Sequence, residues 1–210
     1  MPLVDFGQLP ISFTVLLVSL MLHEAAHAWA GELLGDPTPS QQGRLSFSPA
    51  AHLSLPGSLL FPLASFAGGY ALIGWTKPSP IDVRELGSRW RSRVLMIAAA
   101  GPLASLAVAA VAAGAIRLGA TATGSPLDAI TAPLLFRAVD LNVLLAVFNL
   151  LPVPPLDAGN AVAMLLPSAF VPAAVPWRVA GVVLLFVLAL SGLLAMVIRP
   201  LRSPIVDLLL

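Results

Sequence analysis

The chain has 210 residues, of which 58% are hydrophobic and only 10% are charged, and its mean hydropathy is +0.94. Soluble domains carry about 25% charged residues, so this composition excludes an ordinary soluble protein and predicts helices in lipid, where helices satisfy their own backbone hydrogen bonds. The formal net charge of +1 gives no reason to expect nucleic acid as a partner, and the absence of cysteine excludes disulfides and cysteine-bound zinc. The length suits a single domain over residues 1–210.

Four apolar stretches are long enough to cross the roughly 30 Å hydrocarbon layer of a bilayer. They are 10–34, 94–116, 133–151 and 178–198. A fifth stretch, 55–75, contains prolines and glycines that interrupt a helical pattern, which predicts a re-entrant or strand-like segment beside a cavity. We therefore expect an all-α integral membrane protein, a polytopic bundle of about 4 to 6 transmembrane helices with a short strand-like or re-entrant segment near 55–80.

The first apolar stretch carries His23, Glu24 and His27 in the pattern H-E-x-x-H. Ionisable groups inside a membrane cost about 2.5 to 3.5 kcal/mol each on insertion, so they indicate a function. Residues four apart lie on one face of a helix, and two imidazoles placed in this way can bind one metal ion. The glutamate beside the first histidine can then reach a water molecule near that metal, as in zinc hydrolases.

Basic residues gather between the fifth stretch and the second strong span, and the positive-inside rule places such residues in the cytoplasm. We therefore expect residues 36–93 on the cytoplasmic side, the N-terminus outside, and the H-E-x-x-H site towards the cytoplasm. Arg199 and Arg202 fall outside in this topology, and a fifth true span would reverse part of it. Because no lysine or arginine precedes Arg44, the first stretch lacks the basic start of a signal peptide and is expected to stay in the mature protein.

A second group of polar residues lies between 142 and 159. Asn142 and Asn149 are seven residues apart, on one face of a helix, and the prolines at 152, 154 and 155 prevent that helix from continuing. Asp157 follows this break. A broken helix at membrane depth is tolerated where it lines a protein cavity, so Asp157 can meet the two histidines. Two histidines and one carboxylate leave a fourth tetrahedral position for water, as catalytic zinc requires.

At these residues the chain resembles the site-2 protease family of intramembrane zinc metalloproteases. The family pairs HExxH on a membrane helix with an F-N-x-x-P-x-P-P-L-D-G motif near the far end, and further segments resemble its G-R-L-x-x-N-P-x-x-H, G-W-x-K-P-x-P and A-G-P-x-A-N motifs. The matching segments are HEAAH at 23–27, GRLSFSPAAH at 43–52, GWTKPSPID at 74–82, AAGPLAS at 99–105 and FNLLPVPPLDA at 148–158. The resemblance is strongest over 10–160 and is to compact bacterial or archaeal members that lack a PDZ domain.

The chain departs from the family pattern at three positions. Ser105 stands where the family has its second asparagine, Ala158 stands where it has the first glycine after the aspartate, and Ser48 stands where it has the asparagine of N-P. None of the three is an expected metal ligand. These departures bear on the fit of a substrate more than on zinc binding.

The resemblance and the residue chemistry imply the same metal site. His23, His27 and Asp157 would bind one Zn²⁺ ion, which lowers the pKa of bound water to about 7 and polarises a carbonyl group. Glu24 would take a proton from water and later give it to the leaving amine. The expected enzyme is therefore a zinc metalloendopeptidase.

Substrate binding follows from the same resemblance. Asn149 is the first candidate to hydrogen-bond the substrate backbone or the oxyanion, and Asn142 is a second polar support. The strand-like stretch 68–75 could pair with an extended peptide by strand addition. The implied substrate is a membrane protein with a transmembrane segment, cleaved within or near that segment in the cell membrane of a bacterium or archaeon; the oligomeric state is left open.

Other interpretations remain open from the sequence. The chain could be a catalytically idle membrane scaffold, against which the intact Glu24 argues, or a metal transporter, whose polar sites would be spread across the membrane. Asn142 could equally be a hydrogen-bonding contact between helices. His52 fits a solvated or capping histidine slightly better than a site residue, and Gly101 fits close helix packing better than chemistry.

Overall fold

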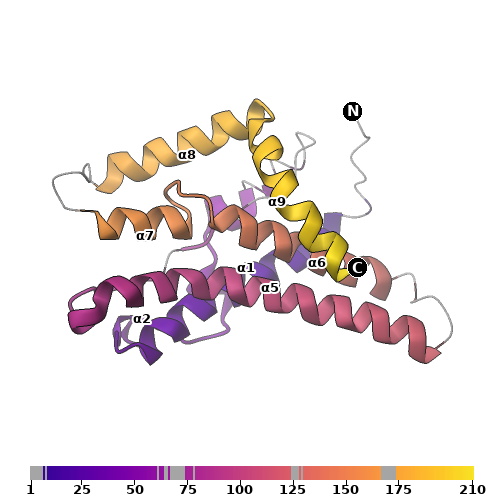
Figure 1. The fold of residues 1–210 in the computed structure, drawn as a ribbon, viewed down its shortest axis with the longest axis horizontal. Coiled ribbons are helices and arrows are strands. Elements are labelled where there is room, and N and C mark those ends of the chain that lie inside the picture. Colours follow the sequence, from indigo (N-terminus) through magenta and orange to yellow (C-terminus); the bar gives the residue numbers. More distant parts are fainter. Residues whose placement is uncertain are drawn as a thin grey trace.

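Helices form all the regular structure of the described residues. The computed structural model describes residues 7, 9–60, 62, 63, 66, 74–77, 79–123, 128, 130–166 and 174–210, and no strand occurs among them. The long helices are α1 (Leu9–Leu33), α5 (Trp90–Thr123), α6 (Thr131–Asn149), α8 (Ala174–Leu190) and α9 (Leu193–Leu209) (Figure 1). The short ones are α2 (Thr38–Gln41), α3 (Pro49–His52), a π-helix (Leu55–Leu60), a 3-10 turn (Gly87–Arg89) and α7 (Asp157–Leu165).

Three of these helices are long and apolar enough to cross a membrane. They cover Leu9–Leu33, Gly87–Gly119 and Thr131–Asn149, where the sequence predicts spans at 10–34, 94–116 and 133–151. The pair Trp177–Ala189 and Leu193–Leu209 passes the same test if it is counted as one span. The prediction of an all-α membrane bundle is thereby confirmed, with three or four membrane-length helices in the described residues.

The last predicted span, 178–198, is not one straight helix. It divides into the end of α8 and the beginning of α9, which meet at an angle of 82°. Gly192 stands at the break with a φ of 78°, in the left-handed region that glycine enters without steric cost. An apolar run therefore contains a sharp turn that hydropathy does not reveal.

The fifth predicted stretch is described only in part. Leu55–Leu60 forms a π-helix that includes Pro56, so this part of the stretch is helical. The expected strand-like stretch 68–75 lies outside the described residues except for Gly74 and Trp75. The peptide N–H of Trp75 donates to the carbonyl of Gly57 at 3.0 Å, so the chain returns to lie beside the π-helix.

The buried core lies between α1, α5 and α6. Small residues on α5 allow close approach, as is typical of helix packing in membranes, and branched side chains of α6 fill the space opposite them. The members of this core cluster with the least exposure are Leu16, Leu20, Ala109, Val139 and Val143. In Figure 1, α5 runs along one side of the molecule, and α7 and α8 lie together at one end of it.

A proline-rich turn separates α6 from α7. Helix α6 ends at Asn149, and α7 begins at Asp157, as the prolines at 152, 154 and 155 predict. A Cβ atom on Gly159 would collide with the backbone of Val153, and one on Gly181 would collide with the carbonyl group of Pro154. The turn is therefore packed closely between α7 and α8, which fixes the position of Asp157.

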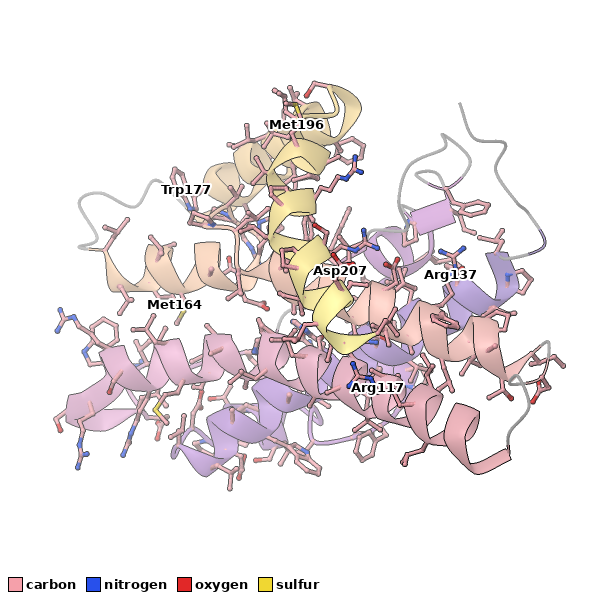
Figure 2. The ribbon with its side chains drawn as sticks, turned by 45° about the vertical axis from the view of Figure 1, so that its right-hand side comes forward. Arg117, Arg137, Met164, Trp177, Met196 and Asp207 are labelled. Carbon is pink, nitrogen blue, oxygen red and sulfur yellow. The ribbon has the colours of Figure 1, made fainter. Side chains whose placement is uncertain are left out.

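Helix α9 is attached to α6 and α5 by charged groups. The guanidinium of Arg202 forms an ion pair with Asp140 at the middle of α6, and both side chains are 31% exposed. Arg117 of α5 lies beside the C-terminal end of α9 and donates to the carbonyl of Leu208 at 3.1 Å (Figure 2). These contacts connect the C-terminal helix to the two helices that form the core.

We expect the Asp140–Arg202 pair to be worth more than a surface ion pair, because loss of one partner leaves a charge among apolar helices. Arg202→Met alone and Asp140→Leu alone should each lower the free energy of unfolding by about 1–3 kcal/mol. The double variant should recover most of that loss. Thermal unfolding in detergent measures the three values, and a double variant that shows the sum of the two losses would contradict the coupling.

Candidate metal centre

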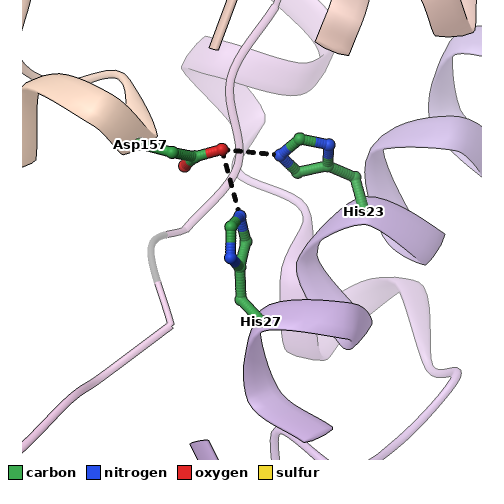
Figure 3. A group of neighbouring side chains, drawn as sticks. All are labelled: His23, His27 and Asp157. Carbon is green, nitrogen blue, oxygen red and sulfur yellow. Dashed lines mark hydrogen bonds and ion pairs between the residues drawn. The ribbon is translucent and has the colours of Figure 1, made fainter. Parts of the chain in front are cut away.

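His23, His27 and Asp157 come together although 134 residues separate the first from the last. The two histidines lie one turn apart on the same face of α1, and Asp157 reaches them from the start of α7 (Figure 3). Oδ2 of Asp157 lies 2.8 Å from Nε2 of His23 and 3.1 Å from Nε2 of His27. One ligand atom from each residue lies within 4.8 Å of the other two, which suits a single metal ion.

The second nitrogen of each imidazole is held by α5. Nδ1 of His23 lies 2.9 Å from the hydroxyl oxygen of Ser105, and Nδ1 of His27 lies 2.7 Å from the carbonyl oxygen of Ile97. A histidine that binds a metal through Nε2 usually donates its Nδ1–H to such an oxygen, which fixes the tautomer and the ring orientation. Both rings therefore direct Nε2 towards Asp157.

The residues fit a bound zinc ion by burial and by donor type. His23 is 3% exposed and His27 is 6% exposed, so water does not satisfy their ring nitrogens. Nε2 of His27 is buried and has no hydrogen-bond partner among the described residues, since its approach to Asp157 lacks hydrogen-bond geometry. Two imidazole nitrogens and a carboxylate oxygen are the set that catalytic zinc uses, and a cation would satisfy all three.

Gly101 of α5 allows the histidines to lie where they do. A Cβ atom at this position would collide with Nε2 of His27 and Nε2 of His23. Because a buried backbone cannot move away cheaply, every larger residue would push the rings out of place. Gly101 is therefore a requirement of the metal centre and not only of helix packing.

Glu24 lies beside the histidines with one oxygen engaged and one without a partner. Its Oε2 accepts a hydrogen bond of 2.7 Å from the hydroxyl of Thr76. Its Oε1 is buried and has no hydrogen-bond partner in the part of the chain that the structure describes, and the whole residue is 4% exposed. A carboxylate with a free oxygen next to a metal centre can accept a proton from water.

A cavity of about 970 Å³ opens onto these residues. Its walls come from α1, α5, α7 and α8, from the end of α6, and from one segment without regular structure, residues 74–77 and 79–82, which we call the lining segment. Residues 74–77 and 79–81 of this segment reach the cavity, and Trp177 at the start of α8 stands on the other side. The volume suits an extended peptide better than an ion alone.

The lining segment is fixed at its far end by the buried carboxylate of Asp36. The backbone N–H of Asp82 donates to Oδ2 of the buried Asp36 at 2.8 Å, and the backbone N–H of Thr38 donates to Oδ1 at 2.9 Å. Hydrogen bonds from the side chain and the backbone of Arg84 lower the pKa of Asp82 to about 2. The segment is therefore held from the loop that follows α1.

The two asparagines predicted from the sequence lie in different surroundings. Asn149 lines the cavity, and its Nδ2 donates to the carbonyl of Leu145 at 2.9 Å. Asn142 is fully buried between helices, where its Nδ2 donates to Ser19 of α1 at 2.8 Å, and it does not line the cavity. The placement of Asn142 matches the alternative of a hydrogen bond between helices.

His52 is not a solvated residue. It is fully buried, and its Nε2 lies 2.5 Å from the carbonyl oxygen of Ser46, while its own carbonyl accepts the backbone N–H of Lys77 at 2.8 Å. It does not line the cavity. Its contacts hold the loop between α2 and α3 against the lining segment, so the interpretation as a solvated histidine is wrong and a structural role is observed.

Sequence reasoning missed the contribution of α5. Ile97, Gly101 and Ser105 follow one another at intervals of four, so they share the helix face that meets the histidines. The signal was present as a glycine and a serine four apart in an apolar run, but the sequence does not say which helix this face meets. Thr76 was missed because it comes from a segment without regular structure.

A helical protein with three or four membrane-length helices and a buried site of two histidines and a carboxylate is, by class, a membrane protein with a candidate metal centre. Over 168 residues the chain is 33% identical to the Bacillus subtilis (strain 168) protein named "Putative zinc metalloprotease YwhC". The matched region covers 76% of this chain and 70% of that protein. The chain belongs to the zinc metalloprotease family of this protein. No family model matches the sequence, and no solved structure matches it.

We expect Asp157→Asn to lower the zinc content of the purified protein. The amide removes the negative charge that lies between the two histidines, and zinc prefers a carboxylate oxygen as ligand. Metal analysis after dialysis against a weak chelator compares the variant with the unchanged chain. An unchanged zinc stoichiometry would remove Asp157 from the set of ligands.

We expect Gly101→Ala to reduce zinc affinity by about tenfold or more, because the added methyl group displaces the ring nitrogens that bind the metal. Gly114 offers a matched control on the same helix, since a Cβ atom there meets no atom within 4 Å. Gly114→Ala should leave zinc affinity unchanged. Equal zinc affinity in both variants would contradict the role given to Gly101.

Proposed function

We propose that the protein is an intramembrane zinc endopeptidase of the site-2 protease type, which hydrolyses peptide bonds within or near transmembrane segments of membrane proteins. The observation that carries the proposal is the convergence of His23, His27 and Asp157 on one face of a cavity bounded by apolar helices. The relationship to a protein named as a zinc metalloprotease supports the reaction class. The apolar helices support the membrane setting.

Glu24 is proposed as the general base. When bound by His23, His27 and Asp157, zinc would supply a Lewis acid that polarises the scissile carbonyl and acidifies water. Oε1 of Glu24 is free to take the proton from the attacking water, whose oxygen forms a bond to the carbonyl carbon. As the C–N bond breaks, Glu24 returns this proton to the leaving amine, so a carboxyl end and an amino end are formed.

Asn149 is proposed to bind the substrate. It lines the cavity, and one of the two N–H groups of its amide remains after the bond to Leu145. That N–H can donate to a substrate carbonyl or to the oxygen that becomes negative in the transition state. A transmembrane substrate must unwind first, because a helix engages its carbonyl groups in its own hydrogen bonds. Strand addition along 68–75 remains part of the proposal, although most of that stretch lies outside the described residues.

The cytoplasmic side of a cell membrane is the proposed location of the site. Ile97, which contacts His27, follows Arg93 by four residues, a rise of about 6 Å along α5. The site therefore lies close to the basic residues at the beginning of α5. Because the positive-inside rule places those residues in the cytoplasm, the active site of a bacterial or archaeal protein would face that side.

The alternatives of an idle scaffold and a metal transporter receive no support from the comparisons. A transporter needs polar sites spaced along a pathway, whereas the described residues contain one group of three or more metal-ligating side chains. An idle scaffold does not require the buried carboxylate of Glu24, whose burial without a second partner is costly. A zinc protease needs both a single metal site and a carboxylate beside it that accepts a proton.

We expect Glu24→Gln to keep its zinc and to lose cleavage of a membrane-embedded substrate by at least about 10²-fold. The amide has a similar shape but cannot take up a proton. The assay uses purified enzyme in proteoliposomes with a single-span substrate, and metal analysis runs on the same samples. Equal cleavage by the variant and the unchanged chain would exclude the proposed role of Glu24.

A further inference from the structure

We propose that Thr76 is a positioning residue of the reaction, whose hydroxyl holds the Glu24 carboxylate so that only Oε1 is left to exchange a proton. The inference rests on the proposed role of Glu24 as general base. It assigns a function to a residue of the lining segment that binds no metal and carries no charge. The substrate does not have to touch it.

The contact between the two side chains is direct. Oγ1 of Thr76 donates to Oε2 of Glu24 at 2.7 Å, whereas Oε1 has no hydrogen-bond partner among the described residues. A glutamate has three side-chain torsions, so without this bond its carboxylate can turn and present either oxygen. With the bond in place, Oε2 is occupied and Oε1 is the oxygen left to face the reacting water.

Thr76 is itself unable to move far, because its two neighbours are fixed by backbone hydrogen bonds. The N–H of Trp75 donates to the carbonyl of Gly57 at 3.0 Å, and the N–H of Lys77 donates to the carbonyl of His52 at 2.8 Å. The carbonyl of Trp75 accepts the hydroxyl of Ser58 at 2.8 Å. The hydroxyl of Thr76 is therefore presented from a rigid piece of backbone.

The same segment approaches Glu24 a second time. Oγ of Ser79 donates to the backbone carbonyl of Glu24 at 3.4 Å, a long contact that involves the main chain of α1 and not the carboxylate. The lining segment thus stays close to α1 over several residues. Only the Thr76 contact involves the group that takes part in the proton transfer.

A small misplacement of a catalytic group can cost a large part of the rate, because the reacting atoms must be aligned within a fraction of an ångström. Loss of the Thr76 hydroxyl should therefore lower kcat. It should leave zinc binding in place, since within the described part of the chain none of His23, His27 and Asp157 forms a hydrogen bond or ion pair with Thr76. It should also leave KM close to its original value.

The test compares Thr76→Val, which keeps the shape and removes the hydroxyl, with Thr76→Ser, which keeps the hydroxyl. Thr38→Val is the matched control, because the Thr38 side chain makes no hydrogen bond in the described part of the chain. We expect Thr76→Val to lower kcat by about tenfold or more with unchanged zinc content and KM. Thr76→Ser should restore most of kcat, and Thr38→Val should behave like the unchanged chain.

A second readout does not depend on proteolysis. The carboxylate band of Glu24 is assigned by infrared difference spectroscopy between the unchanged chain and Glu24→Gln, both loaded with zinc. The band should shift in Thr76→Val, return in Thr76→Ser and stay unchanged in Thr38→Val, since a hydrogen bond alters a carboxylate stretch. This measurement separates the two proposals, because it reports the Thr76 contact even if the protein cleaves no membrane segment.

Four results would overturn the inference. One is full kcat in Thr76→Val at full zinc occupancy, and another is an equal loss of kcat in the valine and serine variants. The third is a Glu24 band that does not respond to the loss of the hydroxyl. If Thr76→Val lost zinc in proportion to its activity, the residue would serve the metal centre and not the orientation of Glu24.

Discussion

The burial of ionisable side chains among apolar helices is the constraint on which the rest of this structure depends. A buried imidazole or carboxylate is tolerated only where a partner compensates the loss of water. His23 and His27 obtain their partners from two directions, through Nδ1 from α5 and near Nε2 from Asp157. Asp157 can reach them only because α6 ends before the proline-rich turn, so a break in one helix completes the site on another.

Helix α5 does more than fill the core. Its face at Ile97, Gly101 and Ser105 supplies a carbonyl, an open space and a hydroxyl to the same pair of histidines. Ser105 stands where the motif that the sequence resembles has asparagine, and its short side chain lies within hydrogen-bond distance of His23, so this departure still gives the imidazole a polar partner. A longer side chain at 105 is not required for this contact, because the close approach allowed by Gly101 brings α5 to the ring.

The lining segment has no regular structure, yet it brings the hydroxyl of Thr76 into contact with Glu24. Asp36 holds one end of the segment, and Gly57 of the π-helix holds the other end through a backbone hydrogen bond. The hydroxyl that meets Glu24 lies between these two points. Loops that carry functional groups are positioned in this way by a rigid scaffold. Helices α7 and α8 line the other side of the cavity. Their packing against the proline-rich turn depends on Gly159 and Gly181.

The sequence by itself determined the membrane-length helices, the pairing of His23 with His27 and the break before Asp157, because each follows from periodicity, hydropathy or proline geometry within a short stretch. It did not determine that 178–198 bends at Gly192, since glycine permits a turn without demanding one. It also did not determine that Asn149 faces the cavity while Asn142 bonds to Ser19, or that Thr76 meets Glu24. Those outcomes depend on which helix faces meet across long sequence separations, and only tertiary packing decides that.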